Sequence, residues 1–174
     1  CIQGFPIGEL LDMSIIWELE GLSDLLYRLV LEDILRTTQA YRLIFPVDGL
    51  KNVFVIDEAH ELLSASEQRD DLSLPYIYRF ARTTRKGGIG LLLADQTPGQ
   101  IPSSVMANMG TRLILRIING PCIKAVASSM SLTQEQASYL PELRPRQAVI
   151  HFLSKPCLIE IPQIKFEDQI TQEE

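Results

Sequence analysis

The chain has few of the residues that build disulfide or metal-bound frameworks. Its 174 residues include three cysteines and two histidines. Cys1, Cys122 and Cys157 are odd in number and scattered, so they fit neither a disulfide framework nor a zinc site, and a reducing, cytoplasmic setting is predicted. His60 and His151 are far apart and have no ligand-like spacing. We therefore expect no metal that is bound by protein side chains alone.

Long apolar runs and excess positive charge are also missing. No run reaches the roughly 18 apolar residues of a membrane-spanning helix, and no secretory signal pattern opens the chain. The net charge of -6 excludes a polycation that coats nucleic acid, although it leaves room for a local basic strip. The size predicts about one domain. Because the sequence begins at Cys1, a fragment of a longer protein is expected.

A phosphate-binding loop is absent as well. No G-x-x-x-x-G-K-[ST] occurs in the sequence, and the nearest candidate, QGFPIGEL, lacks both the lysine and the hydroxyl. Without those amides and that lysine a triphosphate has no cradle. The chain alone is therefore predicted not to be a complete ATPase.

The order of elements predicts an α/β fold. Strands without a polar alternation of their own follow each other with helices in between. This order is typical of a mostly parallel sheet that is covered on both faces. Ser23 is expected to cap one helix, and a T-x-x-Q capping box is expected to open another at Thr133. The expected strands cover residues 13–19, 52–57, 89–94, 111–117, 147–153 and 158–161, and the expected helices cover residues 24–41, 74–86, 103–109, 122–130 and 133–139.

Polar residues follow several of these strands, where α/β sheets bind ligands. Asp57 and Glu58 end VFVIDE, Asp95 and Gln96 end LLLADQ, and a third such end follows residue 117. An acid in the position of Asp57 suits Mg²⁺ held through water, and Glu58 suits the activation of a water that attacks a γ-phosphate. The acid pair could instead cap a surface helix.

Other side chains extend this hypothesis. Gln96 could bond a γ-phosphate or the attacking water, or it could be a solvated loop residue. For His60, the sequence does not decide between a packing role and a role in coupling the site to its surroundings. The segment RFARTTRKGG carries four bases without an acid, and guanidinium groups stabilise charge on a transferring phosphate. Arg82 and Arg85 are three residues apart and share a helix face, although a solvated basic face is the ordinary alternative.

The segments VFVIDEAHELL and RFARTTRKGGIGLLLADQTPGQIPSSVMANMGTRLILRI together resemble the C-terminal half of the HerA-like ATPases, RecA-like motors of the HerA/FtsK group. IIWELEGLSD and PELRPRQAVIHF resemble the flanking parts, so the resemblance covers residues 13–161. It implies an incomplete RecA-like domain over residues 13–162, with residues 1–12 as a linker or remnant and 163–174 as an acidic tail. The family's phosphate-binding loop is N-terminal to this segment.

Position by position, the resemblance implies a role for each candidate. Asp57 would be the Walker B acid on the Mg²⁺ side and Glu58 the catalytic glutamate. Gln96 would be the sensor, and Arg82 or Arg85 the arginine finger offered to the next subunit. The intact protein would bind ATP and Mg²⁺, form a hexameric ring, translocate double-stranded DNA and work beside a nuclease.

Three other interpretations share some of these features. Superfamily-two helicases share D-E-A-H but require Ser-Ala-Thr and Q-x-x-G-R-x-G-R motifs that are absent here. Conjugative type IV secretion ATPases share the acid pair and the glutamine and stay open. A non-catalytic subunit-contact module also stays open.

Overall fold

The computed structural model describes residues 4–63, 76–83, 87–152 and 155–163. These residues belong to two compact units, which divide between Asn108 and Met109. The first unit holds a parallel pair of strands with helices, and the second holds an antiparallel sheet with helices. No described helix combines the length and the apolar content that crossing a membrane would require.

Two parallel strands form the sheet of the first unit. β1 (Asn52–Ile56) pairs with β2 (Ile89–Leu93), in register from one end to the other. Parallel neighbours need a crossover connection, and here it contains α3 (His60–Leu63) and α4 (Tyr76–Thr83). The sequence predicted both strands to within one residue.

The long helix α2 (Asp24–Ile44) begins where the sequence predicts and continues three residues beyond the predicted end at residue 41. The Ser23 hydroxyl accepts a hydrogen bond from the Leu26 N–H at 3.5 Å, which confirms the predicted cap. Pro46 follows the last turn and disfavours helical backbone in the residue before it. The short helix α1 (Ile7–Leu11) contacts α2.

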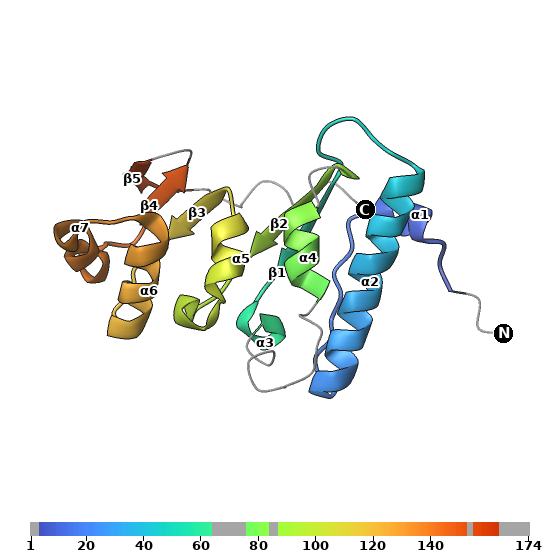
Figure 1. Ribbon diagram of the computed structural model, residues 1–174, viewed down its shortest axis with the longest axis horizontal. Coiled ribbons are helices and arrows are strands. Elements are labelled where there is room, and N and C mark those ends of the chain that lie inside the picture. Colours follow the sequence, from blue (N-terminus) through green and yellow to red (C-terminus); the bar gives the residue numbers. More distant parts are fainter. Residues whose placement is uncertain (1–3, 64–75, 84–86, 153–154, 164–174) are drawn as a thin grey trace. The chain divides into compact units, whose positions relative to one another are not determined.

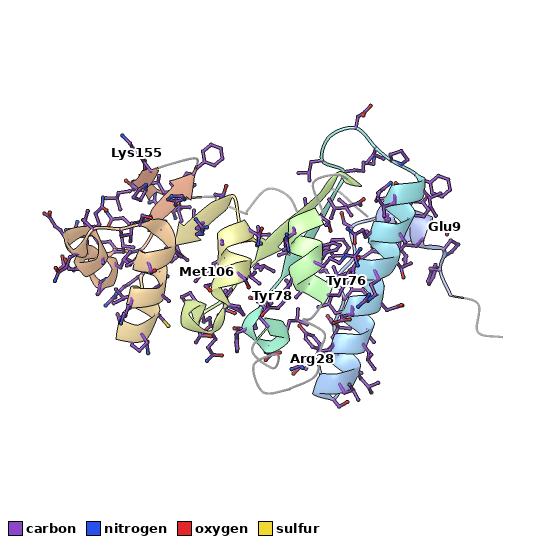
Figure 2. The ribbon with its side chains drawn as sticks, viewed as in Figure 1. Glu9, Arg28, Tyr76, Tyr78, Met106 and Lys155 are labelled. Carbon is purple, nitrogen blue, oxygen red and sulfur yellow. The ribbon has the colours of Figure 1, made fainter. Side chains whose placement is uncertain are left out.

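Helix α4 joins α2 to the sheet (Figure 1). Phe80 is fully buried, and its ring meets Phe54 of β1 edge to face at a centroid distance of 5.7 Å. The Tyr76 N–H donates to Glu32 on α2 at 3.1 Å, and the Arg36 guanidinium lies 4.1 Å from the Tyr76 ring centre. Figure 2 shows Tyr76 at this contact. The aromatic side chains of α4 thus fix it to both neighbours.

The opposite face of the sheet is exposed. Val53 and Val55 on β1 are 53% and 67% exposed, while Phe54 and Ile56 point to the helices. The prediction of a sheet covered on both faces is therefore wrong for this strand. Apolar side chains on both faces of a strand indicate that both faces become buried, but they do not indicate which segment buries them.

The strand predicted over residues 13–19 is also wrong. These residues form no described strand, and Met13 and Ile16 are 65% and 89% exposed. Strand formation needs a hydrogen-bonding neighbour as well as an apolar pattern. Within the described ranges, β1 pairs with β2 alone.

The remaining elements follow the predicted order. In the first unit they are η3 (Pro98–Gln100) and α5 (Ser103–Asn108). The second unit contains β3 (Thr111–Ile114), α6 (Gly120–Met130), α7 (Gln134–Tyr139), η4 (Leu140–Glu142), β4 (Gln147–Phe152) and β5 (Lys155–Glu160).

The second unit is antiparallel, in the strand order β3-β4-β5. The last two predicted strands are present as β4 and β5 and pair with each other. Among the described strands, parallel pairing is confined to β1 and β2. Val126, Met130, Leu140 and Leu143 form the buried cluster beneath this sheet. Thr133 opens α7 with the predicted capping box.

Candidate functional site

The loops that follow β1 and β2 lie against each other. Backbone bonds continue past the strand ends, from the Ala94 N–H to the Ile56 carbonyl at 2.9 Å and from the Ala59 N–H to the Ala94 carbonyl at 3.1 Å. Parallel strands end at the same edge of their sheet, so both polar segments start from this edge. The predicted convergence of Asp57-Glu58 with Asp95-Gln96 is thereby present. The third predicted strand end belongs to the second unit.

Glu58 is held in an uncommon backbone conformation. Its φ of 49° lies in the left-handed region, which costs a residue with a Cβ on the order of 1 kcal/mol. Its N–H donates to the Asp57 carboxylate at 3.0 Å. Its side chain meets two partners: Gln96 Nε2 donates to Oε1 at 2.5 Å, and His60 Nδ1 lies 3.5 Å from Oε2. Both carboxylate oxygens of Glu58 are therefore engaged.

Asp95 is the anchor between the two loops. Its side chain is 3% exposed and accepts four hydrogen bonds. Oδ2 receives the His60 N–H at 2.6 Å and His60 Nδ1 at 3.0 Å, while Oδ1 receives the Thr97 N–H at 2.5 Å and the Thr97 hydroxyl at 3.0 Å. Burial raises the pKa of Asp95, but the hydrogen bonds from Thr97 and His60 together outweigh it and hold this pKa below its usual value.

Sequence reasoning left Asp95 without a role. A signal was available in the spacing Asp95-Gln96-Thr97, because an aspartate commonly accepts from the N–H two residues ahead. For His60 the structure favours coupling over packing, since its ring nitrogen lies between two carboxylates. That arrangement depends on pairing between loops that are 35 residues apart in sequence.

Asp57 is the residue whose setting fits a hydrated Mg²⁺. Its carboxylate is an exposed oxygen ligand at the strand end, and only Oδ1 accepts a hydrogen bond from a described residue. Glu58, His60 and Asp95 also lie close enough to share an ion, with ligand atoms within 4.8 Å. In that group, however, the lone pairs of Asp95 are already taken by four donors. The group is better explained as a hydrogen-bond network.

The predicted arginines are only partly placed. Arg82 lies on α4 and is exposed, and among the described residues its guanidinium makes no hydrogen bond or ion pair. Arg85 lies outside the described residues, as does the basic end of the segment RFARTTRKGG. An exposed Arg82 is compatible both with a solvated face and with a contact to another subunit.

A pocket of about 1140 Å³ opens beside Asp57 and His60. Apolar side chains of the segment around Trp17 form one wall, and α2 contributes Tyr27 and Arg28. Burial and the nearby Glu61 charge raise the pKa of Tyr27. The Arg28 Nε is buried and has no hydrogen-bond partner among the described residues. The pocket thus brings charges of both signs next to the Asp57 carboxylate.

Comparison with known proteins gives relatives in sequence. A probable helicase of Methanocaldococcus jannaschii is 34% identical over 110 residues, which cover 62% of this chain and 21% of the relative. The DNA double-strand break repair helicase HerA of Sulfolobus acidocaldarius is 31% identical over 120 residues, covering 67% of this chain and 23% of the relative. HerA of Sulfurisphaera tokodaii is 31% identical over 129 residues, with 72% and 24% covered. The chain thus spans less than a quarter of these relatives.

Solved structures share the fold. The genome packaging NTPase of Sulfolobus turreted icosahedral virus 2, in complex with ATP-gammaS, is similar with a TM-score of 0.67 and 13% identity, over 92% of this chain and 73% of that one. VirB4 of Thermoanaerobacter pseudethanolicus is similar with a TM-score of 0.63 and 20% identity, over 87% and 41%. No family model matches the chain. The chain has the fold of P-loop ATPases and is a partial homologue of the HerA helicases.

Proposed function

We propose that residues 13–162 are the C-terminal part of a RecA-like motor domain of the HerA type, which hydrolyses ATP once a phosphate-binding loop is supplied from outside this sequence. The observation that carries the proposal is the bond between Glu58 and Gln96, which joins the two loops at the carboxyl edge of the parallel strands. The left-handed backbone of Glu58 supports it, since strain of this kind gathers at functional sites.

Each residue has a separate task in this proposal. Glu58 orients the attacking water and accepts its proton. Asp57 holds Mg²⁺ through water, and the ion would neutralise charge on the phosphates. Gln96, which here donates to Glu58, would exchange that partner for the γ-phosphate or the water.

The proposal extends to assembly and substrate. Arg82 or Arg85 serves as the arginine finger, offered to the nucleotide of a neighbouring subunit in a ring, for which we propose a hexamer. The motor acts on double-stranded DNA, beside a nuclease. Its support is the partial homology to repair helicases and the fold shared with a genome packaging NTPase.

The direct test is Glu58→Gln in the full-length protein that contains this chain. ATP binding should stay near normal, and hydrolysis should fall by roughly 10²- to 10⁴-fold, because the general base is lost. Glu142→Gln is the matched control, since Glu142 is an exposed acid of the second unit. Unchanged hydrolysis in Glu58→Gln would remove Glu58 from the catalytic role.

The finger is tested by mixing subunits. Arg82→Ala or Arg85→Ala subunits, titrated into wild-type protein, should lower ATP turnover more steeply than their fraction predicts for the arginine that acts across the interface. Arg79→Ala, an exposed arginine of the same helix, is the control. A proportional decline for both variants would contradict a finger in this segment.

The alternative of a conjugative type IV secretion-type ATPase differs in what it moves. Fold does not separate the candidates, since the packaging NTPase and VirB4 are similar to the chain at nearly equal TM-scores. Stimulation of ATP turnover by double-stranded DNA that rises with DNA length would favour the HerA-type motor. Turnover without such a response would favour the alternative, and no turnover by the full-length protein would favour a non-catalytic subunit-contact module.

A further inference from the structure

We propose that His60 is a positioning residue for Glu58, and that Asp95 sets the ring of His60 for this purpose. This inference rests on the proposed function, because it assigns the group that aims the general base. It is carried by one chain of contacts, which runs from buried Asp95 through the His60 ring to Oε2 of Glu58, the oxygen that Gln96 does not hold.

The protonation pattern of the ring follows from its neighbours. His60 Nδ1 lies 3.0 Å from the Asp95 carboxylate and 3.5 Å from the Glu58 carboxylate. Ionised carboxylates only accept hydrogen bonds, so Nδ1 must carry the proton that is shared with them. Asp95 thereby selects one tautomer, as carboxylates do for histidines in other sites.

Asp95 is suited to be the fixed end of this chain. Its side chain is almost fully buried, and its four hydrogen bonds come from two loops. It holds both the backbone and the ring of His60, so the ring has little freedom relative to β2. Glu58, by contrast, is a partly exposed side chain on a strained backbone, and it needs a second contact to keep one orientation.

Gln96 and His60 hold Glu58 in different ways. Gln96 belongs to the second loop and bonds Oε1, whereas His60 faces Oε2. When Gln96 turns to another partner, as the proposed sensor role requires, the contact with His60 stays. His60 then keeps the Glu58 carboxylate in one orientation while it activates the attacking water. A misplacement of about 1 Å can cost roughly 100-fold in rate, so we expect loss of this contact to be visible in kcat.

Two isosteric-amide variants of His60 separate positioning from folding. The amide nitrogen of Asn falls near the place of Nδ1, and that of Gln falls near the place of Nε2. In the full-length protein His60→Asn should keep kcat within about threefold of wild type, while His60→Gln should lower kcat about tenfold. KM for ATP should change less than twofold in both, because neither variant touches a nucleotide contact. His151→Gln is the control.

The outcomes are distinct. Equal kcat values for His60→Asn and His60→Gln, at equal melting temperatures, would overturn the positioning role. Loss of hydrolysis in Glu58→Gln with no effect of either His60 variant would leave the proposed function standing and this inference refuted. Retained hydrolysis in Glu58→Gln would refute the proposed function itself. Should both His60 variants melt early, Asp95→Asn against Asp48→Asn gives the same comparison one step further along the chain.

A spectroscopic measurement needs no turnover. In the ¹⁵N-histidine-labelled full-length protein at pH 8, two-bond ¹H–¹⁵N correlations should show His60 protonated at Nδ1, and Asp95→Asn should shift its ring signals while leaving those of His151 in place. A ring protonated at Nε2 alone would contradict the geometry. The same spectra recorded with added Zn²⁺ test whether the group binds metal instead: broadening confined to His60 at equimolar Zn²⁺ would overturn the hydrogen-bond assignment.

Discussion

The two units of the chain distribute their polar side chains differently. Residues 1–108 carry fifteen acids and nine Lys or Arg, for a net charge of -6, whereas residues 109–174 carry seven of each. In the first unit the loops after two parallel strands share one network around Asp95. In the second unit, antiparallel strands end at alternating edges, and its polar side chains bond in helix caps and in contacts between strands. The direction of neighbouring strands thus decides whether the polar side chains at their ends lie at one edge of the sheet.

Truncation of buried side chains should give the largest changes in the free energy of unfolding, and each change should be confined to one unit. Phe80→Ala should cost about 3–5 kcal/mol in the first unit, and Leu143→Ala about 2–5 kcal/mol in the second, because both side chains are at most 2% exposed. Hydrogen exchange read by mass spectrometry should rise in β1 and α4 for the first variant, and in β4 and α6 for the second. Equal loss of protection in both units for either variant would show that the two units unfold together.

The next largest effect should be a loss of stability of the first unit at low pH. The pKa of Asp95 is lowered in the folded chain, so its contribution is complete above the unfolded value of about 3.9 and is lost as the pH falls through the folded pKa. Unfolding of the first unit, followed by urea at pH 7 and at pH 3, should therefore show a smaller stability difference in Asp95→Asn than in wild type. Parallel pH curves for the two proteins would contradict this role.

The smallest effect concerns the second unit alone. Thr133→Ala removes the hydroxyl that accepts the Gln136 N–H at 3.2 Å, and it should cost about 1 kcal/mol in the free energy of unfolding. Ser128→Ala, an exposed serine in α6, should cost far less. Exchange in the first unit should not respond to either change, and a response there would show that the two units unfold together.

Local signals predicted the elements well, and the reason is visible at particular residues. The hydroxyls of Ser23 and Thr133 cap helices by accepting from backbone N–H groups three residues ahead, and such bonds can be inferred from short spacing. Met13 and Ile16 misled the strand prediction because pairing depends on a partner that no local pattern specifies. Val53 and Val55 misled the prediction of cover for the same reason.

The candidate site was predicted in part. Asp57, Glu58 and Gln96 were found from their places after apolar strands, and the structure brings Glu58 and Gln96 into contact. Which oxygen of Glu58 meets which neighbour, and the burial of Asp95, depend on how β1 aligns with β2. That register is a property of the folded pair. The roles of Arg82 and Arg85 stay predictions.

The bare face of β1 has a practical consequence for handling the isolated chain. Val53, Val55 and Leu92 are each at least 50% exposed, on a strand pair that has an open edge in the described part. Apolar surface of this kind on an unprotected strand promotes edge-to-edge association. A preparation of this chain alone should therefore scatter more light as its concentration rises. Under the proposed function, expression of the longer motor protein is the better starting point for biochemistry.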